Sequence, residues 1–191
     1  MQEEQDKVTE WMSVFGQETP DKPMMPSLEV RKLRAKLILE EALETIEALG
    51  VHVELKQAFY HGDNNCSKEK IEIEDVEFYV HANMRASIDK IADGIADSLV
   101  VQLGTAVACG IDIKPIFDEV MRSNWSKAWT GHELKERPSV KGMSITCSYC
   151  KRSIGDCICD TLLDDRCWVV TDASGKVIKS PSYSPANIIL K

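Results

Sequence analysis

Apolar residues recur at helical spacing in four stretches of this chain. The stretches are residues 3–16, 28–49, 86–109 and about 113–123. In each one, apolar side chains three or four positions apart would share one face of an amphipathic helix. Ser27 is a suitable N-cap for the second stretch, and Gly50 and Gly110 are suitable stops for the second and third. The pattern therefore predicts a mainly helical chain.

Two segments depart from this periodicity. Residues 51–55 and 71–74 alternate like short strands around a turn-forming segment at 61–65, which predicts an inserted hairpin or long loop over 51–85. After residue 130 the helical pattern ends, cysteines appear, and residues 168–178 predict a hairpin that turns at Asp172–Gly175. We therefore predict an all-α core over residues 1–130 and a small Cys-rich, β-containing C-terminal appendage over 131–191.

Composition and charge narrow the function classes. The chain has 191 residues, 43% of them hydrophobic, and a net charge of −8, which argues against DNA or RNA binding through a basic surface. We see no apolar run of the roughly 20 residues that span a bilayer, and the polar N-terminus does not resemble a signal peptide. We therefore expect a cytoplasmic protein without a membrane partner, whose seven cysteines are thiols or metal ligands.

Two acidic clusters lie inside the apolar helical stretches. Glu40-Glu41-x-x-Glu44 and Asp93-x-x-x-Asp97 each place carboxylates on one helix face. If the two helices pack face to face, these carboxylates repel each other unless a cation joins them, and such oxygen ligands suit Mg²⁺ or Mn²⁺. The clusters predict metal-assisted chemistry on a phosphate. The alternative is two solvated helix faces with ordinary salt bridges.

A second candidate metal site lies in the appendage. Cys147, Cys150, Cys157 and Cys159 fall within thirteen residues, and four thiolates suit a tetrahedral structural Zn²⁺. The surrounding sequence is poor in apolar residues, and small modules of this kind often need a metal to fold. The alternative is a set of reduced thiols in a surface loop.

The order of these motifs resembles the all-α NTP pyrophosphatase superfamily, which includes MazG, dimeric dUTPases and phosphoribosyl-ATP pyrophosphohydrolase. The matching segments are Leu33-Arg34-x-x-Leu37-Ile38-x-Glu40-Glu41-x-x-Glu44, Ala92-Asp93-Gly94-Ile95-Ala96-Asp97, Gly104 to Asp112, and Glu119-Val120-x-x-Ser123-Asn124-x-Ser126-Lys127. The tail Gly175-Lys176-Val177-x-Lys179-Ser180-Pro181, followed by Pro185, resembles the tail of MazG-like proteins often carried by phages. If the chain is phage-encoded, its location is the host cytoplasm.

The resemblance implies a four-helix bundle that forms a homodimer or homotetramer. It also implies Mg²⁺-dependent cleavage of a nucleoside triphosphate between the α and β phosphates, which gives the monophosphate and pyrophosphate. Carried over by position, the metal ligands would be Glu41, Glu44, Asp93 and Asp97. Glu40 would deprotonate or orient the attacking water, and Asn124 and Lys127 would contact the substrate. We expect the substrate to come from the deoxynucleotide pool.

One position departs from the family pattern. The second acidic motif is usually E-x-x-D, and Lys90 stands where its glutamate is expected. A lysine does not ligate Mg²⁺ but can bind a phosphate as a point charge, while Asp89 could reach the same helix face. A weakened metal site would instead make the protein a nucleotide-binding regulator that uses the zinc segment as a contact surface. A third reading is phosphoribosyl-ATP hydrolysis. The sequence does not identify the base.

Overall fold

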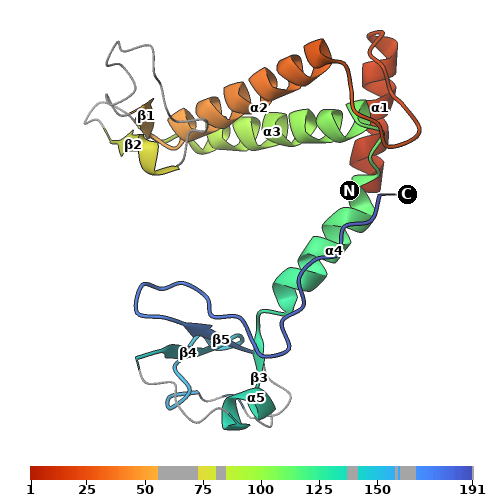
Figure 1. Cartoon of the computed structure of the whole chain (residues 1–191). Helices are drawn as coiled ribbons and strands as arrows, with labels where there is room; N and C mark the ends of the chain where they lie inside the picture. The colour runs from red at the N-terminus through yellow and green to blue at the C-terminus, as the bar shows by residue number, and fades with distance from the viewer. Residues whose placement is uncertain (56–72, 81–84, 137–141, 158, 160–166, 191) are drawn as a thin grey trace, which may run out of the picture. The chain divides into compact units, whose positions relative to one another are not determined.

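The computed structural model describes residues 1–55, 73–80, 85–136, 142–157, 159 and 167–190 (Figure 1). This part of the chain forms two compact units, Met1–Ile113 and Lys114–Leu190, which we describe separately. The first unit holds three helices and a small hairpin, and the second holds a fourth helix, a short fifth helix and a three-stranded sheet. A mainly helical chain with a small β-containing appendage is thus confirmed.

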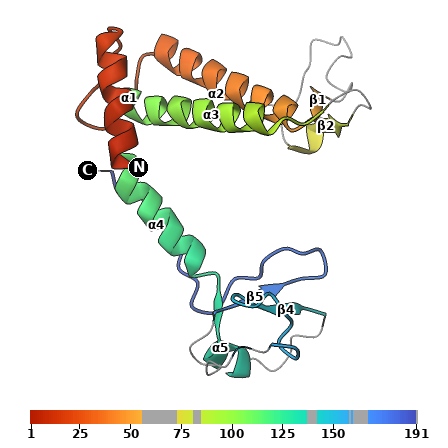
Figure 2. The same ribbon diagram turned by 180° about the vertical axis from the view of Figure 1, so that it is seen from behind.

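The first unit is built on two long antiparallel helices. Its helices are α1 (Gln2–Val14), α2 (Leu28–Ala48) and α3 (Ile88–Ala108). Helices α2 and α3 lie side by side, and α1 crosses them at the end where α2 begins and α3 ends (Figures 1 and 2). Ser27 caps α2 as expected, because its Oγ accepts a hydrogen bond from the backbone N of Val30 at 3.3 Å.

A small apolar core fixes the crossing of α1 and α3. The residues of this core are all buried: Val8, Met12, Leu103, Val107 and Ala108. Arg34 of α2 is buried beside them and donates a hydrogen bond from Nη2 to Gln17 Oε1 at 2.6 Å. Gly104 leaves the space for this arginine, since a Cβ there would lie 2.9 Å from Arg34 Nη1. Burial of the guanidinium lowers the pKa of Arg34.

A hairpin connects the ends of α2 and α3. Strands β1 (His52–Leu55) and β2 (Val76–Tyr79) pair antiparallel, with His52 opposite Tyr79. The pairing of two short strands is therefore confirmed. Of the second strand expected at 71–74, residues 71 and 72 lie outside the described residues, and the expectation is wrong at 73 and 74. Residues Ile73–Asp75 form a 3-10 turn, and the strand begins only at Val76. Apolar and acidic residues already alternate at 73 and 74, outside the strand, so alternation alone did not fix where the strand starts. The expected turn at 61–65 lies outside the described residues.

The second unit contains α4 and a small antiparallel sheet. Its elements are α4 (Ile113–Trp125), β3 (Trp129–Thr130), α5 (Gly131–Glu136), β4 (Ser144–Cys147) and β5 (Cys167–Thr171). The strand order is β3–β5–β4. Four side chains with no exposed surface form the core: Trp129, Cys147, Trp168 and Val170. After β5 the chain turns back as predicted, since the backbone N of Gly175 donates to the carbonyl of Asp172 at 3.0 Å.

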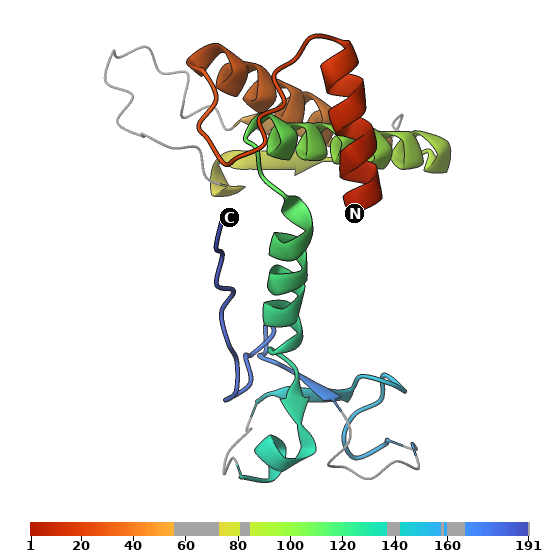
Figure 3. The same cartoon turned by 90° about the vertical axis from the view of Figure 1, so that its right-hand side faces the viewer.

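The C-terminal segment returns along α4 (Figure 3). The backbone N of Asn187 donates to Glu119 Oε1 at 2.8 Å, and the backbone N of Ser184 donates to Ser126 Oγ at 3.0 Å. Hydrogen bonds from Arg122 and from the Asn187 amide lower the pKa of Glu119 to about 2. Segments far apart in sequence are thus joined by polar contacts on one side of α4.

The predicted domain boundary after residue 130 stays a prediction, because the division into compact units at Ile113 does not by itself define independently folding domains.

The expectation that no stretch is apolar enough to cross a membrane is wrong for α3, which passes that test by length and composition. The core helix of a water-soluble bundle passes the same test, and α3 packs along α2 and carries Asp93 and Asp97.

Candidate functional site

Helices α2 and α3 approach each other closely at Gly94. A Cβ on Gly94 would lie 2.7 Å from Thr45 Oγ1 and 3.2 Å from Thr45 Cα, so only glycine permits this packing without a shift. Thr45 Oγ1 donates to the carbonyl of Glu41 at 2.8 Å and lies 3.4 Å from Ser98 Oγ. The contact places the two acidic motifs opposite each other, because Gly94 lies between Asp93 and Asp97 and Thr45 follows Glu44.

A pocket of about 610 Å³ opens beside this contact. Its lining residues come from the end of α2 and the beginning of α3, together with the residues just before α3: Glu44, Glu47, Ala48, Arg85, Lys90, Asp93, Gly94 and Asp97. Four of them are acidic and two are basic. The pocket can therefore hold a ligand that carries both a cation and anionic groups.

Most of the predicted acidic residues meet at this pocket. Glu44, Asp93 and Asp97 line it, as the helical spacing suggested. Glu41 is not among the lining residues, but burial and the negative charges of Glu44, Asp97, Glu40 and Asp93 raise its pKa. Glu40 is exposed and is not among the lining residues, so its assignment as the base stays a prediction.

The donor set fits a divalent metal ion. Burial and the charges of neighbouring carboxylates raise the pKa of Glu41, and a bound cation would relieve that repulsion. Oxygen ligands from four carboxylates match the preference of Mg²⁺ and Mn²⁺. Among the described residues that line the pocket, no cysteine or histidine offers a thiolate or imidazole that would favour a softer metal.

Two basic residues share the pocket with the acids. Lys90 lines it from the first turn of α3, where Ser87 Oγ accepts from the backbone N of Lys90 at 3.4 Å. Asp89, the proposed substitute for the missing glutamate, is not among the lining residues. Arg85 lines the pocket too. It was not predicted as a site residue, because it lies before the helical pattern of α3. Glu47 was also missed, although its place one turn after Glu44 was a usable signal.

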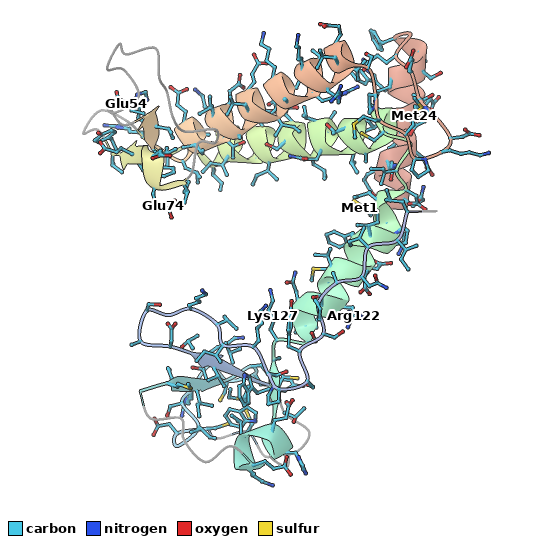
Figure 4. All side chains as sticks on the ribbon, viewed as in Figure 1. Met1, Met24, Glu54, Glu74, Arg122 and Lys127 are labelled. Atoms are coloured by element: carbon cyan, nitrogen blue, oxygen red, sulfur yellow. The ribbon has the colours of Figure 1, made fainter. Side chains whose placement is uncertain are left out.

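The two predicted substrate-binding residues lie in the second unit. Lys127 lies just after the end of α4 (Figure 4). Its Nζ donates to Oδ1 of Asn124, in the last turn of that helix, at 2.7 Å. Lys179, from the returning tail, lies with its Nζ 4.1 Å from the ring centre of Tyr183. A hydrogen bond with Ser123 and the positive charges of Lys179 and Lys127 lower the pKa of Tyr183. Lys179 belongs to the tail motif, Tyr183 was not predicted as a site residue, and the structure adds both to the surroundings of Asn124 and Lys127.

The predicted cysteine cluster comes together in the same unit. The sulfur atoms of Cys147, Cys150, Cys157 and Cys159 all lie within 4.8 Å of one another. All four are free thiols, and they pack on the small core of the sheet. The cluster could bind zinc.

Comparisons with known proteins bear on the first unit and on α4. The family described as phosphoribosyl-ATP pyrophosphohydrolase matches residues 8–124, more than half of the chain. No curated protein matches the chain. The matched segment contains both acidic motifs, the pocket and Asn124. The chain therefore belongs to the phosphoribosyl-ATP pyrophosphohydrolase family, a family of nucleotide pyrophosphohydrolases within the MazG-like NTP pyrophosphatase superfamily.

Proposed function

We propose that the protein is a metal-dependent pyrophosphohydrolase of nucleoside triphosphates that acts on the deoxynucleotide pool. It would cleave the anhydride between the α and β phosphates, so that the products are a nucleoside monophosphate and pyrophosphate. The observation that carries the proposal is the single pocket that Glu44, Asp93 and Asp97 line together with Lys90. Family membership supports the reaction class.

The acidic side of the pocket would hold the metal ion. Glu41, Glu44, Asp93 and Asp97 are the proposed ligands for Mg²⁺ or Mn²⁺, and Glu47 is close enough to the same pocket to assist them. When bound, such an ion supplies positive charge that neutralises phosphate oxygens and makes a nearby water more acidic. The chain's own task is to bring these carboxylates close together, and the close α2–α3 contact at Gly94 supports this part of the proposal.

The remaining residues would orient the phosphates and the water. Lys90 and Arg85 lie on the pocket wall and can bind phosphate oxygens through charge-assisted hydrogen bonds. Glu40 is the proposed base that accepts a proton from the attacking water, a role carried over from its position in the first acidic motif. Asn124 and Lys127 are the proposed contacts to the rest of the substrate. Most of the rate would come from positioning and charge stabilisation rather than covalent chemistry.

Self-association is part of the proposal. Large apolar side chains remain exposed on the two long helices of the first unit: Leu33, Leu39 and Leu43 on α2, and Ile88, Ile95 and Leu99 on α3. A monomer seldom leaves so many apolar side chains exposed on neighbouring helices. We therefore propose a homodimer or homotetramer that covers them.

The matched family favours a second candidate substrate. Phosphoribosyl-ATP carries the same triphosphate chain on a larger nucleotide, and the matching family is described by that activity. The pocket residues described above contact phosphates in either case, so they do not separate the two substrates.

A substrate panel tests the proposal. The purified protein is incubated with each NTP, each dNTP and phosphoribosyl-ATP, with Mg²⁺ and with Mn²⁺, and monophosphate and pyrophosphate are measured. We expect equal amounts of the two products from one or a few deoxynucleotides. Turnover of phosphoribosyl-ATP alone would select the second candidate. Binding of nucleotides without turnover under either metal would overturn the enzymatic proposal and favour a nucleotide-binding regulator.

A further inference from the structure

We propose that the second unit is a structural zinc module in which Cys147, Cys150, Cys157 and Cys159 bind one Zn²⁺ in a closed tetrahedral site. The inference is independent of the acidic pocket and of the reaction proposed for it. Its starting point is the position of the four sulfur atoms, all within 4.8 Å of one another.

The sulfur geometry fits zinc better than it fits disulfides. Sulfur ligands about 2.3 Å from a tetrahedral zinc ion lie roughly 3.8 Å apart. The Cys150 and Cys157 sulfurs lie 3.6 Å apart, and the longest distance in the cluster is below 4.8 Å. A disulfide would need two sulfurs at about 2.05 Å. The four thiols are therefore gathered round one point rather than joined in pairs.

The backbone after β4 holds two of these sulfurs in place through N–H contacts. The backbone N–H groups of Cys150 and Tyr149 donate to the Cys147 sulfur, and that of Arg152 donates to the Cys150 sulfur. Lys151 follows Cys150 with φ at +60°, a left-handed conformation that turns the chain tightly enough for these contacts. N–H donors to sulfur are the outer contacts that orient metal-bound thiolates.

The site is structural because it has no open position and belongs to the core. Four protein ligands complete a tetrahedral zinc, which leaves no place for a substrate or a reactive water. Cys147 has no exposed surface and packs with Trp129, Trp168 and Val170, while Cys150, Cys157 and Cys159 pack against that core. A core with so few fully buried side chains gains much of its stability from a metal.

The zinc module also anchors the returning tail. Trp129 Nε1 donates to the carbonyl of Ile178 at 2.9 Å, and the backbone N of Ile178 donates to the carbonyl of Val170 at 2.8 Å. The tail then bonds α4 through Ser184 and Asn187. Loss of the metal should therefore loosen the sheet and the tail together.

Cys167 is a matched control within the same sheet. It is exposed on β5 and is not among the four clustered cysteines. A serine at Cys167 changes the same chemical group as a serine at Cys150, yet it should leave the metal site intact. Cys109, in the first unit, offers a second control.

Metal content and tryptophan fluorescence test the proposal on the full chain. We expect one zinc per chain by mass spectrometry of metals, unchanged in Cys167→Ser and lost in Cys150→Ser and Cys159→Ser. Because those variants can misfold, the wild-type protein is also treated with a thiol-compatible chelator and then given Zn²⁺ again. The fluorescence of the buried Trp129 and Trp168 should shift on removal and recover on readdition.

Three results would overturn the inference. The first is a protein purified without chelator that contains less than about a tenth of a zinc per chain and gains none when Zn²⁺ is added. The second is zinc that Cys150→Ser retains and Cys167→Ser loses. The third is complete removal of zinc with no change in tryptophan fluorescence, which would show that the metal does not support the fold.

Discussion

Lys90 places a positive charge among the carboxylates of the acidic pocket. It stands on the wall of the pocket beside Asp93 and Asp97, where relatives are expected to carry a further carboxylate. A cation among carboxylates opposes metal binding by its charge, but it attracts the phosphates of a nucleotide. We therefore assign Lys90 to substrate binding.

Lys90→Gln should weaken substrate binding. One charge-assisted hydrogen bond contributes about 1.5–3 kcal/mol, so KM should rise by about tenfold or more while kcat changes much less. Lys36→Gln, at an exposed position of α2 outside the pocket, is the control and should leave KM unchanged. Steady-state kinetics on the preferred nucleotide measure both values. An unchanged KM in Lys90→Gln would contradict the assignment.

Glu119 makes the tail contact sensitive to acid. Its pKa is about 2 in the folded protein, below the ordinary value of 4.5, because Arg122 and the Asn187 amide bind the carboxylate. A lowered folded pKa means that the contact stabilises the fold fully above pH 4.5 and loses this contribution as pH falls towards 2. The Asn187 amide resonance should therefore move along a titration between these values.

Glu119→Gln should release the tail already at neutral pH. Asp118→Asn is the matched control, because Asp118 is the adjacent carboxylate and bonds Lys114 on its own helix rather than the tail. Amide exchange at Asn187 compares the two variants at the same pH. Equal protection in both would show that the Glu119 carboxylate does not hold the tail.

Helical spacing predicted much of the acidic site, and local pattern alone missed the rest. Glu44 lies on a periodic helix, as do Asp93 and Asp97, so their shared pocket followed once the two helices were assumed to pack. Arg85 precedes its helix, and its direction depends on how the chain enters α3, which periodicity does not describe. Tyr183 reaches Ser123 of α4 only because the tail folds back along that helix, a contact that a local pattern does not encode.

At the scale of elements, the α2–α3 contact at Gly94 holds the site together. Gly94→Ala adds a Cβ 2.7 Å from Thr45 Oγ1 and 3.2 Å from Thr45 Cα. Overpacking of this kind costs about 1–3 kcal/mol, more than the up to about 1 kcal/mol that alanine gains over glycine in a helix. We expect a lower urea midpoint and reduced activity.

Two further variants separate packing from a general effect of the substitution. Gly155→Ala is the control, because a Cβ there meets nothing within 4 Å. Thr45→Ala combined with Gly94→Ala should recover part of the loss, since it removes the hydroxyl that a Cβ at Gly94 would meet. A Gly94→Ala protein as stable and active as the wild type would contradict the packing argument.

Element boundaries followed the sequence closely where capping and stop residues were present. The second helix was expected over 28–49 and spans Leu28–Ala48, with Ser27 as its cap and Gly50 just beyond it. The second strand of the hairpin lacked such a marker and was placed too early. Strong terminal residues thus predicted helix ends better than alternation predicted strand ends.

At the scale of the whole molecule, the exposed apolar side chains of α2 and α3 predict self-association. Within one chain, only 33% of the most apolar 18-residue stretch of α3 is buried, so much of its apolar surface is left for a second chain to cover. Leu39→Glu combined with Ile95→Glu should lower the molar mass measured by light scattering to that of one chain. Val177→Glu, an exposed apolar position of the second unit, should not change it. A wild-type protein that is monomeric at tens of micromolar would contradict the prediction.

The most direct measurement is pyrophosphate release by Glu41→Gln. Glutamine keeps the size of the side chain but removes the charge that Glu44, Asp93 and Asp97 surround. Loss of one transition-state contact costs about 10²–10³ in kcat in well-studied enzymes, so we expect a drop of at least about a hundredfold at saturating Mg²⁺. Glu29→Gln, on the exposed first turn of α2, should keep full activity. Equal pyrophosphate release by both variants would contradict the claim that this pocket is the catalytic site.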